Sequence, residues 1–240
     1  MKIEILFSKL CNLYGDSKNV DYLKLSLPEA EFIMTEITDS APYFADNCVD
    51  MVYMGGMSEA AQKRVTQYLM PYKARIEQLI DEGVVFLMTG NALEVFTESI
   101  ENLTAKDKYD GLGIFPLSTK IDLFKRYNGK IMGKINDFTV VGFKSQFSMV
   151  YGNADDCCLF VSDRGTGLNK ETMCEGVRRN NFMGTHILGP ILVLNPLFTE
   201  YIMGLLGVEN PRCAFREQTV AAYEKRLKEF ENKIVPFDKQ

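Results

Sequence analysis

The sequence predicts an α/β fold with three layers, in which a mostly parallel central sheet lies between flanking helices and carries an antiparallel extension. Three observations lead to this prediction. Short apolar segments alternate with amphipathic ones in the first half of the chain, as they do when strands alternate with helices. Residues 84–88 (VVFLM) are an unbroken apolar run of the kind that buried parallel strands show. After Gly111 the segments become short, β-type and separated by turn residues, which indicates antiparallel strands.

The elements of the first half follow in order from these patterns. They are a strand at 2–7, a helix with Asp16 or Ser17 as its N-cap, strands at 31–37 and 49–54, a helix at about 58–82 and a strand at 84–88. Asp and Ser are preferred N-caps because their side-chain oxygens accept hydrogen bonds from the free N–H groups of the first turn. The long helix is predicted by apolar residues that recur on one face, among them Val65, Leu69 and Ile76.

Three turns of this fold are expected at the same edge of the sheet. They are residues 13–16, 54–57 and 88–91, and each follows a predicted strand. Ligands of open parallel sheets bind beyond the carboxyl ends of the strands. The sequence therefore predicts a site where these turns meet.

The chain is divided into an α/β domain at residues 1–207 and a C-terminal helical extension at 208–240. A charged amphipathic helix is predicted at about residues 217–233. Its apolar stripe consists of Val220, Tyr223, Leu227, Phe230 and Ile234. This stripe would cover the sheet, which is the commoner use of such a face, or contact a partner.

Composition excludes several classes of function. The 240 residues are 46% hydrophobic and carry a net charge of -5 without a basic cluster, so we expect no nucleic-acid partner. Six cysteines without CxxC spacing and a single histidine predict no metal site, and no cofactor is expected. Since the N-terminus lacks the features of a signal peptide and no apolar run approaches about 20 residues, we expect a cytoplasmic protein with reduced thiols and no membrane span.

Three features could carry chemistry. Gly55-Gly56 follows a strand, so its N–H groups could face an oxyanion, although a tight turn needs glycine equally. His186 is the one candidate for an imidazole base, but a lone histidine beside apolar residues is more often structural. Thr89 stands at the strand-to-helix turn where many α/β enzymes keep a nucleophile. An internal threonine lacks an activating amine, and with no catalytic side chain to present it need not keep the strained positive φ of such a turn.

Several segments in order resemble one family. They are LCNLYGDSKNVDYL, MVYMGGM, FLMTGNA and GTHILGP, within residues 1–207. As a set they resemble the class I glutamine amidotransferase domain of the cobyric acid synthase type, in the branch that includes the glutaminase subunit of lipid II isoglutaminyl synthase. The resemblance implies a flavodoxin-like class I amidotransferase fold. It also implies glutamine or a related small molecule as ligand, and a Mur-ligase-like synthetase subunit as partner.

The resemblance places the family's catalytic residues on changed positions. The cysteine that attacks glutamine falls on Thr89, and the histidine that activates it falls on Leu188. His186 lies two residues before that position and is not expected to replace the missing imidazole. The resemblance also implies that Gly90 and Asn91 line the pocket.

Further pocket residues are implied by the same alignment. Gly55 and Gly56 correspond to the glycine turn that holds the oxyanion. A basic residue that holds glutamine falls near Arg126 or Lys130.

Two hypotheses follow. In the first, the chain has lost glutamine hydrolysis and acts as a binding or scaffolding subunit. In the second, it is an active amidohydrolase or amidotransferase subunit that uses Thr89 in the retained pocket and supplies ammonia to a Mur-ligase-like or cobalamin-pathway synthetase. Whether the chain is an enzyme is left open by the sequence.

Overall fold

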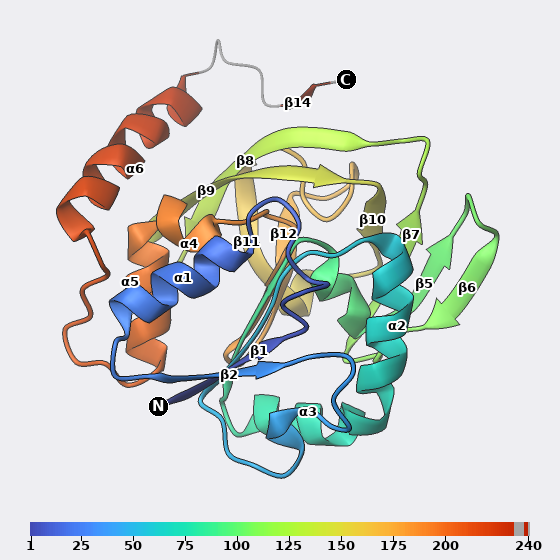
Figure 1. Cartoon of the computed structure of the whole chain (residues 1–240). Coiled ribbons are helices and arrows are strands. Elements are labelled where there is room, and N and C mark those ends of the chain that lie inside the picture. Colours follow the sequence, from blue (N-terminus) through green and yellow to red (C-terminus); the bar gives the residue numbers. More distant parts are fainter. Residues whose placement is uncertain (233–237, 240) are drawn as a thin grey trace.

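One large sheet with helices on both faces forms the centre of the protein (Figure 1). The computed structural model describes residues 1–232 and 238–239. Within these ranges ten strands join this sheet in the order β14-β8-β11-β12-β13-β4-β3-β1-β2, with β9 paired to β8. The parallel strands are β1 (Lys2–Leu6), β2 (Glu31–Thr35), β3 (Met51–Met54), β4 (Val85–Thr89) and β13 (Phe182–Thr185). The predicted α/β fold with a mostly parallel centre is confirmed.

The antiparallel extension adds to the β13 edge and builds a second, smaller sheet. The large sheet continues through β8 (Tyr127–Ile135), β9 (Phe138–Gln146), β11 (Cys158–Arg164), β12 (Cys174–Arg179) and β14 (Asp238–Lys239). The smaller sheet has the order β10-β7-β5-β6, with β5 (Thr97–Asn102), β6 (Asp107–Asp110), β7 (Phe115–Ile121) and β10 (Ser148–Tyr151). Only β5 and β7 run parallel among the described pairings of this second sheet.

Helices cover the large sheet on both faces. One face carries α1 (Ser17–Ser26), α4 (Ile191–Leu194) and α5 (Pro196–Leu205), and the other carries α2 (Glu59–Leu69) and α3 (Lys73–Asp81). Short 3-10 helices are η1 (Tyr43–Ala45), η2 (Met70–Tyr72), η3 (Gly90–Phe96) and η4 (Asp155–Cys157).

Strands β3 and β4 separate two hydrophobic cores. The core beneath α2 and α3 contains Val52, Met54, Phe86 and Met88. The core beneath α1 and α5 contains Met51, Tyr53, Val85 and Leu87. Successive side chains of a strand point to opposite faces, so an unbroken apolar run is required where both faces are buried. This is why the VVFLM segment predicts the central strand.

One local prediction was wrong, and the predicted N-cap at Asp16 is confirmed in position only. The helix expected over residues 58–82 is interrupted by η2, which contains Pro71; proline has no N–H for the helical ladder and disfavours the preceding helical turn. The side chain of Asp16 makes no N-cap hydrogen bond to α1, although Asp16 holds the N-cap position. Its carboxylate is used elsewhere, as described below.

The C-terminal helix α6 (Arg216–Glu231) packs against the antiparallel part of the large sheet. Tyr223 and Phe230 form a small core with Met132 and Val141 of β8 and β9, and Leu227 packs against it. The apolar stripe therefore covers the sheet. Lys233 and Ile234, which the sequence assigned to this helix, lie outside the described residues.

Two of the cysteines are paired. A disulfide joins Cys158 of β11 to Cys174 of β12, which contradicts the expectation that the thiols are all reduced. Cys11, Cys48, Cys157 and Cys213 are free. Of the helices in the described ranges, none has the length and apolar character needed to cross a membrane.

Candidate functional site

The three predicted turns meet at the carboxyl ends of β1, β3 and β4. The Leu13 N–H donates to the Gly56 carbonyl (3.1 Å), and the Met57 N–H donates to Asn91 Oδ1 (2.8 Å). Asn91 Nδ2 in turn donates to the Met57 carbonyl (2.8 Å). These bonds hold the turns against one another and close one wall of a cavity.

The cavity has a volume of about 130 Å³. Its lining comes from the three turns, from β9 and β10 with the residue between them, and from the segment after β13: Leu13, Tyr14, Gly56, Met57, Ser58, Glu59, Gly90, Asn91, Ser145, Gln146, Phe147, Ser148, His186 and Leu188. Gly56, Gly90, Asn91, His186 and Leu188 are thus brought together as the sequence expected. Gly55 and Thr89 are not among the lining residues.

The backbone after β4 turns sharply at Gly90 rather than at Thr89. Gly90 has φ +61°, whereas Thr89 has φ -109° and ψ 152°, which is extended. Thr89 does not keep the left-handed backbone, in agreement with the prediction that it need not. A nucleophile elbow places its reactive residue on the strained strand-to-helix turn, so the backbone gives that position to Gly90.

A side chain at Gly90 would point into the cavity toward Leu188. An ideal Cβ built there lies 3.5 Å from Leu188 Cδ2 and 3.1 Å from Gly56 Cα. Gly90, which has the backbone of an elbow, thus faces Leu188, the expected base position. It also faces Gly56, part of the glycine turn expected to hold an oxyanion. The positions face one another as catalytic groups would, but Gly90 and Leu188 supply no nucleophile and no base.

Thr89 is enclosed behind the cavity. Its side chain is 0% exposed, and its hydroxyl donates to Asp16 Oδ1 (2.7 Å) and lies 3.2 Å from the Tyr53 hydroxyl. Tyr53 also lies within 3.4 Å of Asp16 Oδ1 and accepts a hydrogen bond from Asn19 (3.0 Å). The threonine therefore belongs to a buried polar network, in which it satisfies the Asp16 carboxylate.

Asp16 is the centre of this network. It is fully buried, and loss of solvation raises the pKa of its carboxyl to about 6 from the ordinary 3.8. Hydrogen bonds from Thr89, the Gly56 N–H, Tyr53 and the Gly189 N–H oppose that rise in pKa. Desolvation is the larger effect, because burial disfavours the charged form more than these donors favour it.

The glycine turn already holds the Asp16 carboxylate. The Gly56 N–H donates to Asp16 Oδ2 (3.2 Å), and the neighbouring Met57 N–H is taken by Asn91. An oxyanion hole needs donors that are free to point at a developing negative oxygen. These two N–H groups are not free, because one already donates to the Asp16 carboxylate and the other to the Asn91 side-chain oxygen.

His186 lies beside Leu188 on the cavity wall but is tied to Glu94. The His186 Nε2 is 3.0 Å from Glu94 Oε1, and both side chains are fully enclosed. The hydrogen bonds of the Thr89 hydroxyl go to Asp16 and Tyr53, not to His186. The imidazole therefore does not act on Thr89 in this arrangement.

The two basic residues considered for substrate binding lie in different places. Arg126 donates to Ser145 Oγ (3.0 Å) and to the Tyr14 hydroxyl, and it lies over the Phe147 ring at 5.2 Å, so it borders the cavity mouth. Lys130 pairs with Glu229 of α6 (3.1 Å), on the antiparallel side of the sheet. Arg126 is thus the basic residue beside the cavity.

Sequence reasoning missed Glu94 and the true role of Asp16. Glu94 is a fully buried carboxylate within the apolar segment ALEVF, and a charged residue in such surroundings is the signal that could have identified it. Asp16 was considered only as a cap because its partner Thr89 is 73 residues away. Across the residues that the structure describes, no three His, Cys, Asp or Glu side chains are grouped to hold a metal.

Comparison with known proteins identifies the family. The model of the CobB/CobQ-like glutamine amidotransferase domain matches residues 2–195. The chain belongs to this family. The residues that the family model matches include Gly90, Leu188 and the glycine turn, which face one cavity.

Two curated relatives are subunits of one kind of synthase. The lipid II isoglutaminyl synthase (glutamine-hydrolyzing) subunit GatD of Streptococcus pneumoniae is 27% identical over 199 residues, which cover 81% of this chain and 76% of the relative. GatD of Staphylococcus aureus is 27% identical over 195 residues, covering 80% and 78%. This CobB/CobQ-like chain is thus related to GatD.

The fold is shared with a solved structure at low identity. The structure of PurLQS from Thermotoga maritima matches with a TM-score of 0.53 and 10% identity, over 94% of this chain and 98% of that one. This similarity supports the class of fold alone.

The two candidate elbow positions can be distinguished by alkylation. We expect the thiol of Gly90→Cys to react with iodoacetamide at least about tenfold faster than that of Thr89→Cys, because the first faces the cavity and the second is enclosed. Peptide mass spectrometry measures both rates, with the exposed Cys48 as an internal reference. Gly90→Cys should also lower the free energy of unfolding by about 1–2 kcal/mol, the cost of a left-handed non-glycine residue. Faster alkylation of Thr89→Cys than of Gly90→Cys would contradict this assignment and show that position 89 is the one that faces the cavity.

The raised pKa of Asp16 predicts a pH dependence of stability. Because the folded pKa (about 6) exceeds the ordinary 3.8, the protonated carboxyl contributes stability that is complete below about pH 3.8 and lost as pH rises through about 6. The wild-type free energy of unfolding should fall by about 3 kcal/mol over this range relative to Asp16→Asn, which does not ionise. Urea unfolding of both proteins at pH 4 to 7.5 measures the difference. Parallel profiles would show that Asp16 does not titrate as described.

Proposed function

We propose that this chain is a glutamine amidotransferase-like subunit that has lost glutamine hydrolysis and acts by binding or scaffolding. One observation carries the proposal: the positions that face each other across the cavity, Gly90 and Leu188, have neither a nucleophile nor a base. The amides of Gly56 and Met57, beside them, already hold protein oxygens.

The energetic consequence is large. Removing a nucleophile together with its base lowers rates by roughly a thousandfold to a millionfold, which corresponds to about 4–8 kcal/mol of barrier. Water could still enter the cavity, but no group positioned at Gly90 or Leu188 activates it. Binding does not need these groups, so loss of hydrolysis leaves a binding role intact.

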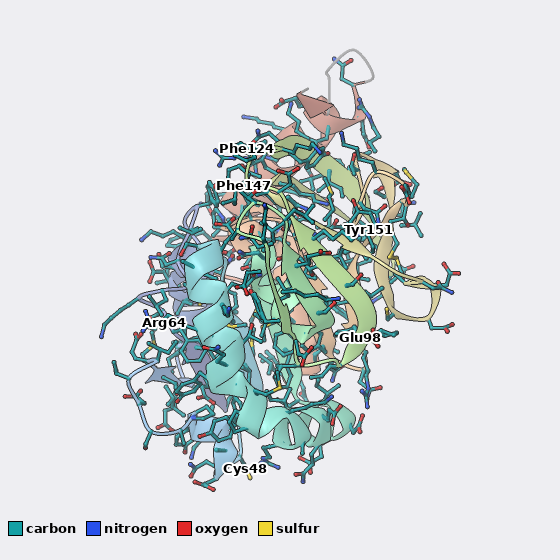
Figure 2. The ribbon with its side chains drawn as sticks, turned by 90° about the vertical axis from the view of Figure 1, so that its right-hand side faces the viewer. Cys48, Arg64, Glu98, Phe124, Phe147 and Tyr151 are labelled. Carbon is teal, nitrogen blue, oxygen red and sulfur yellow. A yellow bond between two sulfur atoms is a disulfide. The ribbon has the colours of Figure 1, made fainter. Side chains whose placement is uncertain are left out.

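A synthetase subunit of the Mur-ligase type is the partner we propose. The relatives are named as subunits of a synthase, which supports a role within an assembly. Apolar side chains gather near the cavity mouth, where Leu13, Tyr14 and Phe147 line the cavity. The Asp122 N–H donates to the Phe147 carbonyl (2.8 Å), and Phe124, two residues after Asp122, is 87% exposed. Figure 2 shows Phe124 and Phe147 at the same end of the molecule. Exposed apolar side chains of this kind suit a protein interface.

A second candidate function is an amidohydrolase that uses Thr89. The hydrogen bond from Thr89 to Asp16 favours it, since a carboxylate beside a hydroxyl is a nucleophile-and-base pair in outline. The burial of Thr89 argues against it, because a substrate carbonyl must reach within about 3–3.5 Å of a nucleophile. We therefore retain the non-hydrolytic function as the proposal.

Ammonia release from glutamine tests the choice. We expect wild type, Thr89→Val and His186→Phe to release ammonia at the rate of the buffer blank, with or without the synthetase subunit. GatD of Staphylococcus aureus, named as glutamine-hydrolyzing, is the positive control. Release by wild type that Thr89→Val abolishes would establish the second candidate. Ammonia release that persists in Thr89→Val but is lost in His186→Phe would also overturn the proposal, because it would show hydrolysis that depends on His186 and not on Thr89.

A further inference from the structure

Strand β2 is the last strand of the large sheet, at the end opposite to β14 (Figure 1). Its inner edge pairs with β1, and among the described strands none pairs with its outer edge. The protein therefore presents an open strand edge, with which a further strand can form hydrogen bonds.

The backbone groups that point outward from β2 follow from its bonds to β1. The Glu31 N–H donates to a backbone carbonyl beside β1 (2.9 Å), and the Thr35 carbonyl accepts from a backbone N–H there (2.6 Å). Because successive residues of a strand direct their backbone groups to opposite edges, Phe32 and Met34 direct theirs outward. Within the described residues these two N–H and two C=O groups have no hydrogen-bond partner.

The side chains of β2 do not protect this edge. Phe32 and Ile33 are half-buried and Met34 is 44% exposed, so three successive apolar residues lie at the border of the sheet. Soluble proteins usually protect such an edge with lysine, proline or a β-bulge. The EFIMT sequence of β2 and its unshifted register with β1 include none of these. An apolar edge of this kind indicates a surface that another chain covers.

The edge is complementary to a second copy of itself. Residues that exchange both N–H···O=C bonds in an antiparallel pair must both face the shared edge. If Ile33 lies on a two-fold axis, Phe32 of each copy faces Met34 of the other, and both pairs can exchange two hydrogen bonds. Moving the axis by one residue leaves a single such pair within β2. Symmetry and hydrogen bonding therefore select one register.

The charges at the two ends of β2 agree with this register. Glu31 of each copy faces Thr35 of the other, so no carboxylate lies directly opposite another. Lys24 lies over the Phe32 ring (5.5 Å to its centroid), toward the amino-terminal end of β2. Antiparallel pairing places this end beside the carboxyl end of the second β2, which Glu36 follows. A lysine thus comes near a glutamate on each side of the axis.

We propose that two copies of this chain form a dimer by antiparallel pairing of their β2 strands, with Ile33 on the two-fold axis. The pairing joins the two large sheets into one continuous sheet. The described lining of the cavity includes no residue of β2, so both cavities stay accessible in the dimer. The inference is independent of the proposed loss of hydrolysis, because it concerns a different surface.

Disulfide trapping tests the register. Two residues that meet on the axis form a non-hydrogen-bonded pair with Cα atoms about 4.5 Å apart, within the range of a disulfide. In a Cys48→Ser background, which removes the exposed native thiol, we expect Ile33→Cys to form a covalent dimer when oxidised glutathione is added. The matched control Glu31→Cys should stay monomeric on non-reducing gels, because its two copies lie roughly 13 Å apart along the strands.

Edge-blocking variants test the pairing itself. Met34→Lys places a charge on the apolar edge, and Met34→Pro removes an outward N–H without removing a bond to β1. We expect sedimentation equilibrium to show a wild-type dimer whose dissociation constant rises at least about tenfold in both variants. The control Met70→Lys changes a methionine of η2 that is 36% exposed and should leave this constant unchanged. Circular dichroism checks that each variant is folded.

A wild-type chain that stays monomeric at its highest soluble concentration would overturn the inference. So would an unchanged dissociation constant in folded Met34→Lys, or equal cross-linking at positions 31 and 33, because either result would place the interface elsewhere. None of these outcomes bears on glutamine hydrolysis, which the ammonia assay measures separately.

Discussion

The buried carboxylate of Asp16 is the constraint on which the site depends. It accepts hydrogen bonds from the Thr89 hydroxyl and the Gly56 N–H, and so joins the turn after β1 to the ends of β4 and β3. A carboxylate without solvent requires such donors, since burial of an unpaired charge is costly. Of these two donors, the Gly56 N–H belongs to a residue that lines the cavity, so it would otherwise be open to a ligand. Satisfying Asp16 therefore holds the walls of the cavity in place and occupies one of its N–H donors.

Close packing around Asp16 also explains the glycines of the site. A Cβ at Gly55 would lie 2.7 Å from Asp16 Cβ, and a Cβ at Gly189 would lie 2.7 Å from Asp16 Cα. Both distances are too short for any side chain, so these positions admit glycine alone. Gly90 differs, because a Cβ there meets Gly56 at 3.1 Å and opens toward Leu188. These glycines are thus required by packing, whatever chemistry the cavity performs.

The sequence predicted the fold well because its strongest signals are local. An unbroken apolar run identifies β4, and alternation of strand and helix identifies the parallel sheet. The site was predicted less completely. Motif matching placed the missing cysteine on Thr89, whereas the positive φ of Gly90 is a property of the backbone that no residue type reveals by itself. The Asp16 to Thr89 bond and the pairing of His186 with Glu94, 92 residues apart, arise only when distant segments pack together.

Covalent trapping tests the central claim, that no side chain of this cavity attacks glutamine. The wild-type chain would be incubated with a diazoketone analogue of glutamine and its intact mass measured, with GatD of Staphylococcus aureus treated in parallel. The absence of a nucleophile at Gly90 and the enclosure of Thr89 predict an unchanged mass for this chain. A single adduct that maps to Thr89 would contradict the account.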